Sequence, residues 1–238
     1  MTILMLPLMA HGQNLSTDST SFERLFFQRA LAERVPVFHI IDQPMEVFEG
    51  FDLGSPPVEQ RNDWDRKWLR RIYSSESVSF SRMMIGADKV GYPTIYGVPI
   101  LYAGTHFANA GPSRDDVFRM AISWIGAAGG ALALKRLVRR PRPFSVMEQI
   151  PLRSQHVGAK GLDEYASFPS GHAALSFAIA TTLSLQHSEW AVVIPSTLVA
   201  SSISLSRIWL GAHYPTDVLT GAGLGIGTAV IVHFLVLK

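Results

Sequence analysis

The sequence predicts an all-α protein: a bundle of about five transmembrane helices, preceded by amphipathic helices that lie at the membrane interface. Hydrophobic residues make up 47% of the chain and charged residues only 17%, whereas charged residues are about 25% of an average soluble domain. Several apolar segments approach the length of a bilayer span, about 20 residues, and they are rich in small residues that pack helices closely inside a bilayer. The five segments are residues 90–109, 117–134, 169–186, 189–205 and 216–236. A soluble protein with buried helices is the alternative for the weaker ones.

The chain ahead of these segments divides into two parts. Residues 1–12 form a short apolar run, followed by small and polar residues, as at the end of a secretory signal peptide cleaved near Gly12. The run has no positively charged start, so an apolar tail is the alternative. Residues 13–76 form a polar region with amphipathic helices, and residues 77–238 form the membrane-embedded core.

Two amphipathic helices are expected in the polar region, within residues 14–35 and over residues 63–77. In the second helix, apolar side chains gather largely on one face and Arg and Lys lie opposite, a pattern that suits a helix in the membrane interface. The apolar residues of this face are Trp64, Trp68, Leu69 and Ile72. A surface helix of a soluble domain is the alternative.

The charge of the chain matters by its position more than by its sum. A formal net charge of +2 is too small to indicate a nucleic-acid partner, and the positive charge is concentrated in KRLVRRPRP, residues 135–143. The absence of cysteine rules out disulfides and thiolate chemistry. No cluster of carboxylates suited to a metal is visible, so we expect neither a metal nor another cofactor.

The basic cluster offers two kinds of cation. Pro141 disfavours helical geometry at Arg140, so a helix is expected to end near there, with Arg142 in the turn beyond it. Lys135 provides the compact charge of an ammonium group, and Arg142 provides a planar guanidinium that can donate two parallel hydrogen bonds. The alternative is a topology signal or a lipid-headgroup anchor, which the positive-inside tendency would place in the cytoplasm.

The second polar cluster is PSGH, residues 169–172, at the mouth of a long apolar helix. Ser170 is a good N-cap, and Gly171 lets a ligand approach the backbone closely. A helix start is an anion site because its N–H groups lack partners. His172 in the first turn is placed to give or take a proton, although a capped structural histidine is the alternative.

The third cluster is SRIWLGAHYPTD, residues 206–217. Pro215 is expected to open the last helix, so that Asp217 lies in its first turn and its carboxylate leans back toward His213. A carboxylate bonded to one imidazole nitrogen leaves the other nitrogen's lone pair available, as in an activated histidine nucleophile. A structural Asp–His pair is the alternative. Arg207 adds a further cation.

If all five apolar segments cross the membrane, the three clusters lie on the same side of it. Together they supply a lysine, two arginines, a helix start and two histidines, one with an aspartate behind it. These groups suit a tetrahedral anion with two or more negative charges, whose charge the cations neutralise without a metal.

The three clusters resemble the motifs of the type 2 phosphatidic acid phosphatase superfamily, which includes lipid phosphate phosphatases, bacterial class A acid phosphatases and vanadium haloperoxidases. The family motifs are K-x6-R-P, P-S-G-H and S-R-x5-H-x3-D, and every position matches in order and spacing. The matching residues are Lys135, Arg142, Pro143, Pro169, Ser170, Gly171, His172, Ser206, Arg207, His213 and Asp217. The match covers residues 117–217 directly, and the flanking helices fit the membrane branch of the family.

The resemblance implies hydrolysis of a lipid phosphate or diphosphate monoester through a phosphohistidine, without a metal. It implies that His213 attacks phosphorus, that Asp217 orients it, and that His172 protonates the leaving alkoxide and then activates water. The residues that it implies for phosphate binding are Lys135, Arg142, Ser170, Arg207 and the backbone N–H of Gly171. The expected partners are this substrate and membrane lipids; the sequence indicates neither which lipid is used nor an oligomeric state.

Three alternative functions share parts of this pattern. A soluble, secreted acid phosphatase has the same motifs, and only the apolar segments argue against it. A vanadium haloperoxidase usually has a much longer chain. A non-catalytic membrane protein that binds phospholipid would need neither histidine nor Asp217.

The orientation follows from the number of spans. The membrane enzymes of the family usually have six, with one ahead of the amphipathic region, whereas this sequence shows five. A cleaved signal peptide would leave the site of an integral protein of the bacterial inner membrane facing the periplasm or exterior. A chain that starts in the cytoplasm would place the site inward.

Overall fold

The computed structural model describes residues 63–75, 77–108, 111–153 and 163–236. These residues all belong to the larger of the chain's two compact units, residues 41–238. Within the described ranges the chain forms helices and no strand, which confirms the predicted all-α class. The signal peptide and the first amphipathic helix that the sequence predicts lie outside the described residues.

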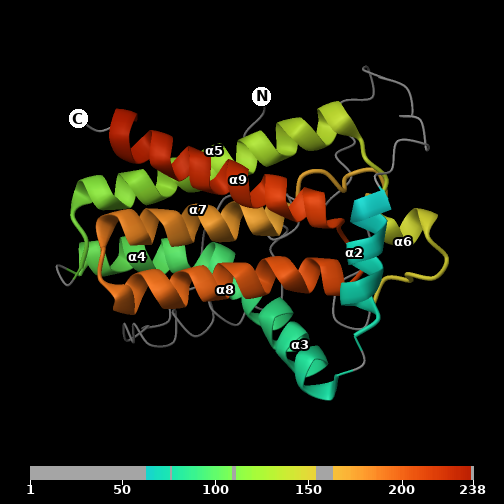
Figure 1. Cartoon of the computed structure of the whole chain (residues 1–238). Helices are drawn as coiled ribbons and strands as arrows, with labels where there is room; N and C mark the ends of the chain where they lie inside the picture. The colour runs from blue at the N-terminus through green and yellow to red at the C-terminus, as the bar shows by residue number, and fades with distance from the viewer. Residues whose placement is uncertain (1–62, 76, 109–110, 154–162, 237–238) are drawn as a thin grey trace, which may run out of the picture. The chain divides into compact units, whose positions relative to one another are not determined.

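All five apolar segments are helical (Figure 1). The first segment begins in α3 and continues through a π-helix, η3, into α4. The elements in order are α2 (Asp63–Tyr73), α3 (Val78–Tyr92), η3 (Pro93–Gly97), α4 (Val98–Phe107), α5 (Arg114–Val138), α6 (Pro143–Val146), α7 (Gly171–Gln186), α8 (Trp190–Trp209), α9 (Pro215–Ile231) and η4 (Val232–Val236).

Three stretches of the described chain are long and apolar enough to cross a membrane. They lie within Arg114–Val146, Trp190–Trp209 and Pro215–Leu235. α7 is shorter, at 16 residues, and most of its side chains are buried because α5, α8 and α9 pack against it.

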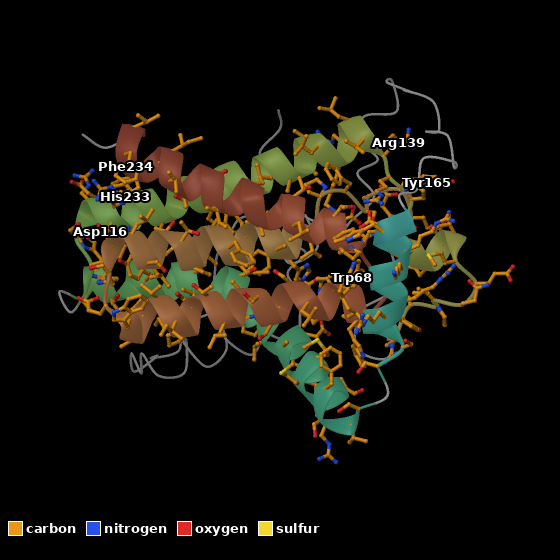
Figure 2. The ribbon with its side chains drawn as sticks, in the orientation of Figure 1. Trp68, Asp116, Arg139, Tyr165, His233 and Phe234 are labelled. Atoms are coloured by element: carbon orange, nitrogen blue, oxygen red, sulfur yellow. The ribbon has the colours of Figure 1, made fainter. Side chains whose placement is uncertain are left out.

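The long helices alternate in direction, which brings the three polar clusters to the same end, as the sequence predicts. Figure 2 shows Asp116, His233 and Phe234 at one end of the bundle and Arg139 and Tyr165 at the other. At the first end, the Gln186 side chain donates a hydrogen bond to the backbone carbonyl of Asp116 (2.9 Å), which joins the end of α7 to the start of α5.

α7 and α9 pack closely because small residues line their contact. A Cβ atom at Gly221 would collide with the backbone carbonyl of Ser170, and one at Gly225 would collide with that of Ala174. Such glycines four residues apart let two helix backbones approach in a bilayer. This contact fixes the start of α7 against the first turns of α9, where the second and third clusters lie.

α2 lies across the site end of the bundle (Figure 1). Leu69 is fully buried, while Trp64 and Trp68 are 43% and 40% exposed. The predicted amphipathic helix therefore exists, but it ends at Tyr73 rather than at residue 77. The reason is that the Ser77 side chain caps the next helix, α3, and accepts a hydrogen bond from its backbone (3.4 Å).

α5 ends at Val138, close to the end that Pro141 predicts. The chain leaves the helix through Arg139, which adopts a left-handed conformation with φ 45° and ψ 45°, while its N–H donates to the Lys135 carbonyl (3.1 Å). This conformation costs a non-glycine residue about 1–2 kcal/mol. Glycine is the usual residue at such a helix end.

We therefore expect Arg139→Gly to be more stable than Arg139→Ala, because both variants lose the side chain and only glycine tolerates the positive φ. A difference of about 1 kcal/mol corresponds to about 2–4 °C in Tm for a chain of this size. Thermal unfolding of the two purified variants in the same detergent measures it. An alanine variant with the higher Tm would contradict the left-handed helix end.

Candidate active site

The site is assembled around residues 163–170, which bind to the other two polar clusters through the backbone. Ser167 N donates to the Arg140 carbonyl (3.0 Å), and Ser170 N donates to the Asp217 carbonyl (2.9 Å). Arg142 N donates to the Glu164 carbonyl (2.7 Å). Segments far apart in the sequence thus meet at one end of the bundle.

His213 lies in the turn between α8 and α9 and is buried. Its Nδ1 is 2.7 Å from the backbone carbonyl of Ser167. Because a carbonyl oxygen only accepts hydrogen bonds, Nδ1 carries the proton and Nε2 carries the lone pair. Arg142 Nη1, 3.2 Å from Nε2, donates to that lone pair. Both contacts specify the same tautomer, with the Nε2 lone pair turned toward a cation.

Asp217 is fully buried in the first turn of α9. Its carboxylate accepts hydrogen bonds from Ser167 Oγ (2.5 Å), Tyr214 N (2.8 Å) and Arg140 Nη1 (2.5 Å). Its Oδ2 is 3.7 Å from His213 Nδ1, which is too far for a hydrogen bond. The direct bond that the sequence predicts does not form, because these donors hold the carboxylate and the Ser167 carbonyl takes the imidazole proton. Ser167 contacts both partners and so connects them.

Arg140 extends this network to α2. It donates to Asp217, to Thr216 Oγ1 (2.7 Å) and to Asp65 Oδ2 (2.7 Å), and its guanidinium lies 4.1 Å from the centre of the Tyr214 ring. Asp65 also accepts from Thr216 N (2.9 Å) and Oγ1 (2.5 Å). A buried carboxylate of α2 is therefore bonded directly to the first turn of α9.

Lys135 and Arg142 are buried cations that backbone carbonyls hold in position. Lys135 Nζ donates to the Ala166 carbonyl (2.6 Å). Arg142 Nε donates to the carbonyl of Asp163 (2.9 Å), and Nη1 also donates to that of Ala212 (3.2 Å). A carbonyl orients a cation without cancelling its full charge, so both side chains add positive potential beside His213.

The start of α7 adds its own partial positive charge. Ser170 is its N-cap, with Oγ accepting from Ala173 N (3.5 Å), and Gly171 is its first residue. His172 follows in the first turn and is 5% exposed. Its ring meets the ring of Tyr92 from α3 nearly at right angles, with 5.0 Å between centroids.

Arg207 lies in the last turn of α8 and forms a buried ion pair with Asp88 of α3. Its backbone carbonyl accepts hydrogen bonds from Ala212 N (3.1 Å) and His213 N (3.3 Å). The residue thus provides a cation and also shapes the turn that presents His213.

The structure brings all eight predicted site residues to one end of the bundle and adds five that the sequence analysis missed. Arg140 lies inside the first polar cluster and Ser167 two residues ahead of the second, so their positions carried a signal. Asp65 was detectable as an acid beside the apolar face of an amphipathic helix. Asp88 and Tyr92 come from α3, where nothing in the local sequence indicates a site.

The arrangement is suited to binding and attacking a tetrahedral anion. Lys135, Arg142 and the start of α7 supply positive charge, Arg207 supplies a guanidinium paired with Asp88, and His213 Nε2 supplies a lone pair directed toward Arg142. Buried hydrogen bonds fix these groups in advance, as electrostatic stabilisation of a transition state requires. Within the described ranges, no group of three or more His, Asp or Glu side chains is placed to hold a metal ion.

Comparison with known proteins agrees with these features. The PAP2 superfamily matches residues 116–238, more than half of the 238 residues. The chain is 39% identical over 167 residues to an undecaprenyl-diphosphatase of Sulfolobus acidocaldarius, covering 70% of this chain and 76% of that protein. It is 38% identical over 106 residues to a decaprenylphosphoryl-5-phosphoribose phosphatase of Mycolicibacterium smegmatis, covering 42% of this chain. The match spans about half, 52%, of that relative's length.

The fold is also found in a solved structure. The crystal structure of Aquifex aeolicus LpxE superimposes with a TM-score of 0.60 at 23% identity, covering 75% of this chain and 99% of that one. This likeness concerns the fold alone. With the matching family, the three motifs and the shared fold in agreement, the chain belongs to the PAP2 superfamily.

Proposed function

We propose that this protein is an integral membrane phosphatase that hydrolyses a lipid phosphate or diphosphate monoester through a phosphohistidine, without a metal. The observation that carries the proposal is the tautomer of His213, whose Nε2 lone pair meets Arg142 while Nδ1 is bonded to Ser167. A binding site for phospholipid headgroups would not need a buried, tautomerically fixed imidazole. The apolar helices of the described chain favour the membrane enzyme over a soluble acid phosphatase.

In the first step, the Nε2 lone pair of His213 forms a bond to phosphorus while the bond to the leaving alkoxide or phosphate oxygen breaks. His172 gives that oxygen its proton. The proton on Nδ1 of His213 stays on Nδ1 and remains hydrogen-bonded to the Ser167 carbonyl, which therefore orients the ring throughout. Lys135, Arg142 and Arg207 and the N–H of Gly171 stabilise the charge on the phosphoryl oxygens.

In the second step, His172, now neutral, takes a proton from water. The water oxygen bonds to phosphorus, the N–P bond breaks and inorganic phosphate leaves. Asp217 positions the nucleophile through Ser167, and Arg140 balances its negative charge. The enzyme returns to its starting protonation state.

The substrate class rests on the chain's relatives. Two of them are named for phosphorylated polyprenyl lipids. A panel of phosphatidate, phosphatidylglycerol phosphate, undecaprenyl diphosphate and a lipid A phosphate would identify the substrate of this chain. A purified protein that hydrolyses none of them would contradict the lipid phosphatase proposal.

We place the protein in the bacterial inner membrane with its site facing the periplasm or exterior. Lys135 and Arg142 are buried in the site, so part of the basic cluster serves phosphate binding rather than topology. The last helix runs away from the site end, so a reporter fused after Lys238 should be cytoplasmic. A reporter that is active only outside the cytoplasm would reverse this orientation.

Activity should survive an excess of EDTA, because cations of the protein take the role that a metal has in other phosphatases. The measurement is phosphate release from a lipid phosphate before and after chelation, with a magnesium-dependent phosphatase as the positive control. Loss of activity that magnesium restores would contradict the assigned site.

The two site histidines should fail in different ways. His213→Ala removes the nucleophile and should form no phosphoenzyme. His172→Ala removes the acid, and general acid catalysis contributes about 10²–10⁴-fold, so alkyl phosphates should react slowly. p-Nitrophenyl phosphate needs no protonated leaving group, so this variant should regain part of its first step and accumulate labelled phosphohistidine.

Rapid-quench labelling with phosphate-labelled substrates measures these differences. His233→Ala is the matched control, because His233 lies at the opposite end of the bundle (Figure 2), and it should behave as the wild type. An acid-labile phosphoenzyme in His213→Ala would exclude His213 as the nucleophile. Equal losses with both leaving groups in His172→Ala would exclude His172 as the acid.

A further inference from the structure

A groove of about 260 Å³ lies between α7, α8 and the segment that joins η3 to α4. Thr94 of η3 and Val98 of α4 line one side of it. α3 contacts α8, and η3 contacts α7, so this segment runs along the same helices that carry His172 and Arg207 at their site ends. The groove therefore lies along the two helices that lead to the proposed phosphate site.

The register of α7 aligns the groove with the proposed acid. Ser176, Ala180 and Leu183 line the groove and follow His172 by four, eight and eleven residues. At about 100° per residue, Leu183 and Ser176 lie about 20° and 40° around the helix from His172 and Ala180 about 80°, so all three lie on the side of α7 that carries His172. At a rise of 1.5 Å per residue, the three residues lie about 6, 12 and 16 Å along the axis from His172.

Two groove residues of α8 likewise lie on the side of that helix that carries Arg207. Ala200 and Ser196 line the groove and precede Arg207 by seven and eleven residues, about 10 and 16 Å along the axis. Along the helix axes the lining thus begins about 6 Å from His172 and about 10 Å from Arg207 and ends about 16 Å from both, within the depth of half a bilayer's hydrocarbon core.

The lining is suited to a hydrocarbon. Its two helical serines turn their hydroxyl protons back to their own helices, because Ser196 Oγ donates to the Val192 carbonyl (2.7 Å) and Ser176 Oγ to that of Ala173 (3.3 Å). Val199, on the rim, is 39% exposed, so the groove is open sideways toward the lipid that surrounds the helices.

We propose that this groove binds the hydrocarbon chain of the phosphorylated lipid whose phosphate is held beside His172 and Arg207. The inference rests on the proposed function and adds the place where the tail binds. A lipid whose phosphate lies in the site has its chain directed into the membrane, and this groove lies along both helices one to two turns from the site.

A second, larger groove, of about 410 Å³, provides the contrast. It lies between α2, α8 and α9, and α8 lines it with Ser201, Ser204, Leu205 and Ile208. At about 100° per residue, this stripe lies on average about 110° around α8 from Arg207, whereas Ala200 lies within about 20° of it. The tail of a bound substrate would have to turn around the side of α8 to reach the second groove.

The test uses a series of alkyl monophosphates from butyl to dodecyl, with p-nitrophenyl phosphate as the substrate without a tail. In the wild type, kcat/KM should rise by up to about fourfold for each methylene that enters the groove. Ala200→Leu narrows the groove near the site and should lower kcat/KM for dodecyl phosphate by about tenfold or more, while p-nitrophenyl phosphate changes little. Ala222→Leu, which narrows the second groove, should leave the ratio of the two substrates unchanged.

The outcomes separate this inference from the proposed function. A wild type that hydrolyses none of these phosphates would contradict the phosphatase itself. Hydrolysis without dependence on chain length, or a selective loss on dodecyl phosphate in Ala222→Leu alone, would overturn the tail groove while the phosphatase stands.

Photolabelling of the wild type keeps the inference testable if Ala200→Leu does not fold. The probe is dodecyl phosphonate with a diazirine at the end of the chain, whose C–P bond is not the bond that the enzyme cleaves. Mass spectrometry should find the label in residues 176–183 or 195–200. Label confined to residues 201–208 and 215–222 would place the tail in the second groove and overturn the inference.

Discussion

The carboxylate of Asp217 holds the site together. It is fully buried, and its donors come from the segment before α7, from the start of α9 and from the end of α5. Arg140 continues the network to Asp65 of α2. Removing one partner of a buried charge pair typically costs about 3–5 kcal/mol, so this one group affects how four parts of the chain meet.

His213, the proposed nucleophile, depends on this network indirectly. His213 receives its orientation from the Ser167 carbonyl, and Ser167 is held in turn by Asp217 through its hydroxyl and by Arg140 through its backbone. Protein groups hold the cations of the site: backbone carbonyls bind Lys135 and Arg142, and Asp88 pairs with Arg207. Because the fold itself positions these charged groups, we expect little reorganisation during reaction.

The sequence predicts the helices and the cluster of site residues well, because both depend on local rules. Proline at residues 141 and 215 and serine at 170 mark helix ends, and the spacing of apolar segments brings three polar clusters to one end. The direct Asp217–His213 bond was not predictable in the same way. Which acceptor takes the imidazole proton depends on residues 163–170, whose path is set by tertiary contacts. Asp88 and Tyr92 are likewise invisible in the sequence, because only the packing of α3 against α7 and α8 brings them to the site.

An experimental structure of the full chain with orthovanadate tests most directly whether His213 is the nucleophile. Orthovanadate adopts the five-coordinate geometry that phosphorus has in the transition state, so it should bind tightly as a transition-state analogue. The account predicts vanadate bonded to Nε2 of His213, surrounded by Lys135, Arg142, Arg207 and the start of α7, with His172 next to the apical oxygen opposite His213. Vanadate bonded to His172, or bound away from both histidines, would contradict the assignment of His213 as the nucleophile.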